Sequence, residues 1–229
     1  MDARAEQGPK PDTSLISDEN ERLRRENEAL GQRVAELERK LSLQPQTGLP
    51  THFRLELELD DLIDTARRES PSRGFAVLIV QLGENYGVVR KTLKASVSEW
   101  ILYQTGCRIT ALLREEDRLF HTHESEFVLL LPGMKGEDLA AFLRRLLPRL
   151  NEPHIFAGFN VAVGAYSGAA YWPEHGEERS VLLHHADIAV GASVEARKAF
   201  LLFRPPLLEK AVEKVELQNS IIKAIEATA

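Results

Sequence analysis

Histidine and acidic residues alternate in the middle of the chain, and these residue types can bind metal ions. His121 and His123 stand two residues apart on an expected strand, which predicts that they share one face of it, and Glu124 and Glu126 follow. Imidazole and carboxylate groups are zinc ligands, but no third histidine or cysteine is placed to close a zinc shell. We therefore expect neither a metal site nor a cofactor.

Arg114 and Asp117, within the sequence Arg-Glu-Glu-Asp, form a second candidate site. An arginine fork can donate two parallel hydrogen bonds, and an aspartate can accept hydrogen bonds. The alternative is a solvent-exposed ion pair of little energetic value. An Arg-x-x-Asp sequence is expected about once by chance in a chain of this composition, so only its position can favour a site.

The composition limits the kinds of protein in which such sites could work. The 29 Lys and Arg against 35 Asp and Glu give a net charge of −6, which argues against nucleic-acid binding through a basic surface. The single cysteine, Cys107, cannot form an internal disulfide. No apolar run approaches the ~20 residues that span a bilayer, and the N-terminus lacks the apolar stretch of a signal peptide. We expect a cytoplasmic protein without membrane or nucleic-acid contacts.

The N-terminal part predicts a flexible leader over residues 1–13 and a coiled-coil helix over residues 14–44. Two series repeat every seven residues with an offset of four: Ile16, Leu23, Leu30 and Leu37, and Asn20, Asn27, Val34 and Leu41. This spacing forms one apolar stripe that needs a partner, and asparagine within it favours a parallel, two-stranded dimer. The expected dimerisation residues are Leu23, Asn27, Leu30, Val34, Leu37 and Leu41. The alternative is an amphipathic helix folded back on its own domain.

Residues 45–204 have the alternating pattern of a mixed α/β domain, and residues 205–229 predict a C-terminal amphipathic helix. Helices are expected near residues 53–66, 88–113, 137–150 and 178–199. Strands are expected at residues 75–80, 155–171 and 199–203, with a hairpin at 118–131 that turns at 122–125. The two candidate sites therefore lie on the hairpin and on the segment that precedes it.

Four segments in this order resemble the GGDEF domain, the diguanylate cyclase fold of bacterial signalling. They are Thr47-Gly48-Leu49-Pro50, the strand 76–80, His123-Glu124-Ser125-Glu126-Phe127 at the place of the signature, and Ala186-Asp187-Ile188-Ala189. The resemblance implies an α/β domain with a central, mostly antiparallel five-stranded sheet flanked by helices. The predicted coiled-coil helix precedes this domain in the sequence.

Several departures from the family pattern predict that no cyclase reaction takes place. His123 and Glu124 replace the two glycines that let the backbone approach the GTP phosphates, and Ser125 and Gln81 replace two acidic metal ligands. The base-reading Asn-Asp pair falls near residues 89 and 90, which are Val and Arg, and the late phosphate-binding lysine falls near Val194. Phosphoryl transfer depends on positioning and charge neutralisation by such groups. Glu126 and Phe127 complete the degenerate signature.

The resemblance also implies a role for Arg114 and Asp117. Five residues, 118–122, separate them from the degenerate signature, which is the family's spacing for the inhibitory site that binds cyclic di-GMP. The family's second arginine falls on Arg145, next to Arg144. We therefore expect a cyclic di-GMP ligand at Arg114, Asp117 and Arg145.

The resulting interpretation is a non-catalytic receptor that binds cyclic di-GMP and signals to a downstream protein partner that the sequence does not identify. In the family this site commonly takes an intercalated ligand dimer that links two domains. The alternative from another class is a nucleotide-independent dimerisation or scaffold module built on an inactive GGDEF fold. Residual GTP binding or cyclase activity is a third possibility.

Overall fold

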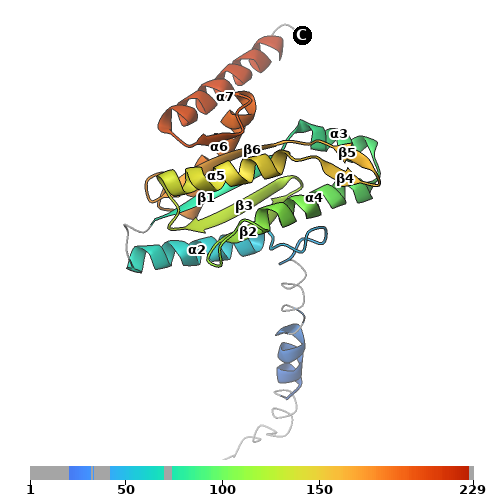
Figure 1. The fold of residues 1–229 in the computed structure, drawn as a ribbon. Helices are drawn as coiled ribbons and strands as arrows, with labels where there is room; N and C mark the ends of the chain where they lie inside the picture. Colours follow the sequence, from blue (N-terminus) through green and yellow to red (C-terminus); the bar gives the residue numbers. More distant parts are fainter. Residues whose placement is uncertain (1–20, 32, 34–41, 70–73, 227–229) are drawn as a thin grey trace, which may run out of the picture. The chain divides into compact units, whose positions relative to one another are not determined.

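The computed structural model describes residues 21–31, 33, 42–69 and 74–226 (Figure 1). The chain divides into two compact units, Met1–Leu41 and Ser42–Ala229. This division falls three residues before the predicted boundary between residues 44 and 45. In the described ranges, no helix is both long and apolar enough to cross a membrane.

In the first unit, residues 21–31 and residue 33 are helical, and all their side chains are exposed. Leu23 and Leu30, two residues of the predicted dimer seam, are 47% and 59% exposed in the single chain. The seam positions Val34, Leu37 and Leu41 and the predicted leader lie outside the described residues. The parallel coiled coil therefore stays a prediction.

The second unit is a five-stranded sheet with helices on both faces. Its helices are α2 (His52–Glu69), α3 (Glu84–Thr92), α4 (Ala95–Thr110), α5 (Gly136–Asn151), α6 (Arg179–Glu195) and α7 (Pro205–Glu226). Its strands are β1 (Phe75–Leu82), β2 (Arg118–His123), β3 (Glu126–Pro132), β4 (His154–Phe156), β5 (Phe159–Val161), β6 (Ala165–Trp172) and β7 (Phe200–Leu202). The large sheet has the order β2-β3-β1-β6-β7, and β4 and β5 form a separate hairpin. All pairs in the large sheet are antiparallel except β6 with β7, which confirms the expected fold class.

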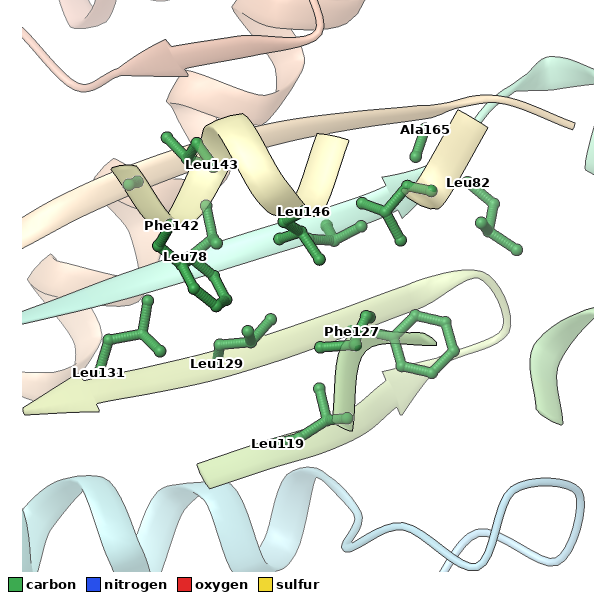
Figure 2. Packing of buried hydrophobic residues seen from close by; sticks show 14 of the residues in the cluster. Leu78, Leu82, Leu119, Phe127, Leu129, Leu131, Phe142, Leu143, Leu146 and Ala165 are labelled. Atoms are coloured by element: carbon green, nitrogen blue, oxygen red, sulfur yellow. The ribbon is translucent and has the colours of Figure 1, made fainter. Parts of the chain in front are cut away.

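The central strand β1 is apolar throughout because both of its faces are buried. Ala76, Leu78 and Val80 belong to a core shared with α3, α4 and α5, whereas residues 75, 77 and 79 belong to a core shared with α2 and α6. Figure 2 shows side chains of α5, among them Phe142 and Leu146, lying over β1 and β3 in the first of these cores. The hairpin β2–β3 is part of this sheet and therefore lies between two packed cores.

The single helix predicted for residues 88–113 is wrong. The chain forms α3, which begins earlier at Glu84, and α4, which ends at Thr110. Leu93 and Lys94 separate them in extended conformations, with ψ angles of 171° and 147°. Neither residue is a glycine or proline, so the break carries no local sequence signal.

A short loop over residues 42–51 leads into the domain and contacts the hairpin. Leu43 and Pro50 form an isolated bridge, and Gly48 adopts a φ of 70°, a conformation that favours glycine. The backbone N–H of His121 donates to the carbonyl of Pro50 at 2.8 Å. The His121 ring nitrogen Nδ1 and the Thr47 hydroxyl lie 3.0 Å apart. The Thr-Gly-Leu-Pro segment therefore positions strand β2.

Candidate functional site

Several positions at which the sequence is expected to depart from the cyclase pattern come together in one hollow. Gln81, Arg90, Glu124, Ser125 and Val194 line a cavity of about 230 Å³ between the end of β1, α3, the hairpin turn and the end of α6. The backbone N–H of Leu82 donates to the carbonyl of Ser125 at 2.9 Å, which holds the turn against β1. Val89, by contrast, is buried in the core.

An ion pair joins two walls of this hollow. The Arg90 guanidinium on α3 contacts the Glu124 carboxylate in the hairpin turn. The other lining carboxylate, Glu84, lies in the first turn of α3, where the helix dipole favours a negative charge. A magnesium ion that bridges phosphates needs several free anionic oxygens. Among the described residues, no three His, Cys, Asp or Glu side chains are arranged to hold a metal ion.

The prediction that His121 and His123 share a face of the hairpin is wrong. The pairing of β2 with β3 shifts between these two residues, so that His121 is opposite Phe127 and His123 is opposite Glu126. One extra residue in a strand turns the following side chain to the other face. His121 is buried and stacks on Phe127, whereas the His123 side chain is 69% exposed.

Sequence reasoning missed a second hollow, on the face of the sheet covered by α2 and α6. Its volume is about 200 Å³, and its titratable lining residues are His52, His123, Glu126, His184 and Asp187. Glu126 accepts from the Thr122 hydroxyl and lies 3.0 Å from the ring nitrogen of His123. Burial, and then the charge of Glu126, raise the pKa of Asp187. These residues come from three distant segments, so sequence spacing gave no signal for them.

The Arg-x-x-Asp sequence forms a tight turn between α4 and β2. One carboxylate oxygen of Asp117, Oδ2, accepts the backbone N–H of Arg114 at 2.8 Å. Asp117 is only 5% exposed, and within the described part of the chain its other oxygen, Oδ1, is buried without a hydrogen-bond partner. Burial raises the pKa of Asp117, while the hydrogen bond from Arg114 opposes that rise. A buried acceptor without a donor is costly and could be satisfied by a ligand N–H.

The arginine of this turn is placed differently from the aspartate. The Arg114 side chain is 47% exposed, and its Nη1 lies 3.6 Å from the Glu116 carboxylate, which is itself exposed. Exposed ion pairs of this kind contribute little energy. The Arg114 guanidinium can therefore exchange this partner for a ligand at small cost.

Arg118 is a further residue of the turn that sequence reasoning missed. Its Nη1 donates to the backbone carbonyls of Glu115 at 2.6 Å and Asp117 at 3.0 Å. Its Nε also lies 3.9 Å from the carboxylate of Glu58 on α2. Through these contacts, the Arg118 side chain stabilises the backbone of the turn. Only the close sequence spacing to residue 115 could have indicated this contact.

The third predicted ligand residue, Arg145, is exposed on α5. Helix α5 packs against α4, the helix that leads into the turn. In the described ranges, no hydrogen bond or ion pair joins Arg145 to Arg114 or Asp117. Arg145 is thus on a neighbouring element, without a hydrogen bond or ion pair to Arg114 or Asp117 among the described residues. Arg144, beside it, is exposed as well.

Several curated relatives of this chain are bacterial proteins of cyclic di-GMP metabolism. The bifunctional diguanylate cyclase/cyclic di-GMP phosphodiesterase MucR of Pseudomonas aeruginosa is 28% identical over 181 residues, 79% of this chain and 26% of MucR. The cyclic di-GMP phosphodiesterase PdeR of Escherichia coli is 26% identical over 79% of this chain and 27% of its own length. The chain therefore spans about a quarter of these two relatives.

Solved structures share the fold. The GGDEF domain of TpbB from Pseudomonas aeruginosa matches with a TM-score of 0.69 and 23% identity, over 74% of this chain and 98% of that one. The coiled coil and GGDEF domain of DgcB from Caulobacter crescentus, in complex with c-di-GMP, match with a TM-score of 0.64 and 15% identity, over 83% and 98%. The family model described as diguanylate cyclase, GGDEF domain, matches residues 43–199. This chain therefore belongs to the GGDEF family.

Proposed function

We propose that this chain is a non-catalytic receptor for cyclic di-GMP, which it binds through Arg114, Asp117 and Arg145. The observation that carries the proposal is the buried Oδ1 of Asp117, which has no hydrogen-bond partner among the described residues. Leaving a buried acceptor unsatisfied costs ~1–3 kcal/mol. A guanine N–H edge would supply the missing donor, and the Arg114 guanidinium could then bind guanine O6 and N7.

The charged side chains at and near the turn suit cyclic di-GMP as the ligand. Arg114 and Arg145 would supply positive charge to the anionic phosphates and hydrogen bonds to the bases, while Asp117 would select for a base with an N–H edge. Arg118 keeps the turn closed before any ligand arrives, because it donates to two of its carbonyls. A pre-formed site loses less conformational entropy on binding.

The lack of catalysis is part of the same proposal. The amide of Gln81 and the hydroxyl of Ser125 replace groups that would carry the charge needed to hold magnesium, and Arg90 neutralises Glu124. Phosphoryl transfer without metal and phosphate ligands would lose most of its transition-state stabilisation. The chain would then act by binding alone.

Binding would be transmitted through the quaternary structure. In the proposed cytoplasmic homodimer, held by the N-terminal coiled coil, a ligand that contacts two domains would favour one arrangement of them over others. A partner protein could read that arrangement. The DgcB structure combines the same elements, a coiled coil, a GGDEF domain and c-di-GMP, which supports this organisation.

Isothermal titration calorimetry with cyclic di-GMP tests the proposal on the full chain. We expect saturable binding by the wild type and at least tenfold weaker binding by Arg114→Ala, since a hydrogen bond to a charged group contributes ~1.5–3 kcal/mol. The matched control is Arg25→Ala, which removes the same charge from an 81% exposed position of the first unit. Absence of binding by the wild type would overturn the receptor and leave the scaffold alternative.

Catalysis is tested separately by incubation with GTP and magnesium, followed by chromatography of the products. We expect no cyclic di-GMP from the wild-type chain. Formation of cyclic di-GMP at a rate proportional to protein concentration would overturn the argument from the lost metal ligands.

A further inference from the structure

Helix α7 starts as part of the domain and then leaves it. Leu207 and Leu208 pack against the core between the sheet, α2 and α6. The Lys214 ammonium contacts the Glu195 carboxylate at the end of α6. From residue 212 to residue 223 every side chain is exposed, and Figure 1 shows this part of α7 extending away from the sheet. The helix is therefore anchored at one end only.

The exposed part of α7 carries an unusual amount of apolar surface. Val212, Val215 and Ile222 are 48%, 55% and 52% exposed, and Leu217 and Ile221 are 62% and 50% exposed. Isolated helices of this length are marginally stable in water, and most helices in proteins are stabilised by packing of an apolar face. Contiguous exposed apolar surface marks an interaction site.

Three of these apolar residues and Asn219 lie on one face of the helix. Val212, Val215, Asn219 and Ile222 follow one another at steps of three, four and three, the spacing of a coiled-coil seam. At about 100° per residue, these four lie within an arc of about 80°. We call these four residues the C-terminal seam. Leu208 precedes them in the same register, in the turns where the helix packs on the core.

Beyond these anchored turns, the four residues of the C-terminal seam are exposed. Lys214, which contacts Glu195, lies about 120° around the helix from the centre of the seam. Leu217 lies about 180° from the seam. The seam thus presents three apolar side chains, and all four of its residues are exposed in the described part of the single chain.

We propose that the C-terminal seam packs against the same seam of a second copy of this chain, in a parallel two-stranded arrangement. Asn219 identifies this occupant, because a lone asparagine within an apolar seam favours a parallel dimer in which it pairs with its own copy. The N-terminal heptads carry Asn20 and Asn27 at equivalent positions. The two ends of the chain thus carry the same type of self-recognition.

The seam is short, so its pairing depends on association of the chains elsewhere. Two heptads alone form weak dimers, but the N-terminal coiled coil would hold two copies together at an effective concentration in the millimolar range. The proposal thus rests on the predicted homodimer and not on cyclic di-GMP binding. It gives the dimer a second contact on the C-terminal side of the domain, which would restrict how the two domains can rearrange.

Disulfide trapping in the full chain tests the pairing directly. In a Cys107→Ser background, Asn219→Cys places one thiol at the centre of the seam, and Leu217→Cys places one on the opposite side of the helix as the control. A disulfide requires Cα atoms within about 7 Å, which only the seam position satisfies in the proposed dimer. We expect covalent dimers for Asn219→Cys at least tenfold faster than for Leu217→Cys. Equal rates, or faster reaction at 217, would overturn the proposal.

A second measurement avoids any new thiol. The double variant Val215→Lys/Ile222→Lys should raise the dimer dissociation constant of the full chain at least tenfold in sedimentation velocity, because four charges would face each other across the seam. Leu217→Lys should leave the constant unchanged. All three positions are exposed, so the domain should melt as the wild type does. An unchanged dissociation constant in the double variant would contradict the pairing even if the thiols were too far apart to react.

Discussion

Asp117 combines two properties that a purely structural residue rarely has. One carboxylate oxygen closes the turn by accepting the Arg114 N–H, and the other is buried without a partner in the described part of the chain. Burial accordingly raises the pKa of the carboxyl group. The residue is therefore costly to stability in the free chain, which is expected at a binding position that a ligand completes.

The substitution Asp117→Asn separates the two properties. The amide oxygen can still accept the Arg114 N–H, and the buried negative charge disappears. We expect the free energy of unfolding to stay within ~0.5 kcal/mol of wild type or to rise, measured by urea denaturation. Affinity for cyclic di-GMP should fall at least tenfold, because the amide N–H groups would face guanine N–H donors. Glu115→Gln, on an exposed neighbour, should change neither quantity; a stable Asp117→Asn variant with full affinity would contradict this role.

The environment of His154 leads to a prediction of how the stability of the domain depends on pH. It is 1% exposed, and its Nε2 lies 3.4 Å from Arg108, whose guanidinium donates to the carbonyls of Glu152 and Pro153 at 2.6 and 2.8 Å. Burial, and then the charge of Arg108, lower the pKa of His154 to about 4. The unfolded chain, with a histidine pKa of about 6.5, therefore binds the proton first. Stability is complete above about pH 6.5 and is lost as the pH falls towards 4.

The expected contribution of His154 over this range is on the order of 3 kcal/mol of unfolding free energy. Burial also lowers the pKa values of His121 and His175, which act in the same direction. Urea denaturation at pH 7 and at pH 4.5 measures the effect. His154→Gln should reduce the difference between the two pH values. An equal pH dependence in His154→Gln and wild type would disprove the assignment.

At the scale of elements, the contact of β6 with α6 sets the geometry of the sheet. A Cβ atom added to Gly168 would lie 2.3 Å from the backbone nitrogen of Val190 and 2.6 Å from the carbonyl carbon of Ala189. The strand and the helix could not approach as they do with any other residue at this position. The close approach also positions the end of α6, where Val194 lines the same hollow as Gln81 and Ser125.

Two glycine substitutions test this contact against a matched control. Gly168→Ala should lower the free energy of unfolding by ~3 kcal/mol, because backbone atoms of α6 must move. Gly191→Ala, within α6 itself, meets no atom within 4 Å and should raise it by ~1 kcal/mol through helix propensity. Thermal unfolding followed by circular dichroism measures both. An unchanged free energy of unfolding in Gly168→Ala would show that α6 packs less closely on β6 than in the structure.

At the scale of the whole molecule, the proposed signalling depends on the predicted dimerisation through the first unit. Leu23 and Leu30 expose 47% and 59% of their surface in the single chain, so the seam needs a partner to be buried. We expect a dimer at micromolar concentration by multi-angle light scattering. Leu23→Lys/Leu30→Lys should give a monomer, because the C-terminal seam is too short to hold the chains together.

Glu28→Lys is the control for this experiment. It introduces the same charge at an exposed position of the same helix, outside both heptad series, and should leave the dimer intact. A wild-type monomer at micromolar concentration would contradict the predicted coiled coil, and with it the arrangement of two domains that cyclic di-GMP would link.

Local patterns in the sequence were enough to predict most elements. The apolar run of β1 and the polar turn of the hairpin predicted the correct structures. A strand buried on both faces and a reversal of the chain each depend on residue types that follow one another in the sequence. The break at Leu93 and Lys94 was missed since neither residue disfavours a helix. The face of His123 was missed because a single-residue bulge, which no motif marks, reverses it.

The sequence by itself determined the family, the expected replacement of metal-binding and phosphate-binding residue types, and the periodicity of the predicted coiled coil. These are properties of residue identity and spacing, which the chain carries before it folds. Only the tertiary structure decided that Asp117 is buried with one oxygen unpaired among the described residues, that Arg90 and Glu124 pair across the hollow, and that α7 leaves the domain. Each of these depends on segments far apart in the chain, because burial and charge pairing are set by the neighbours that folding brings together.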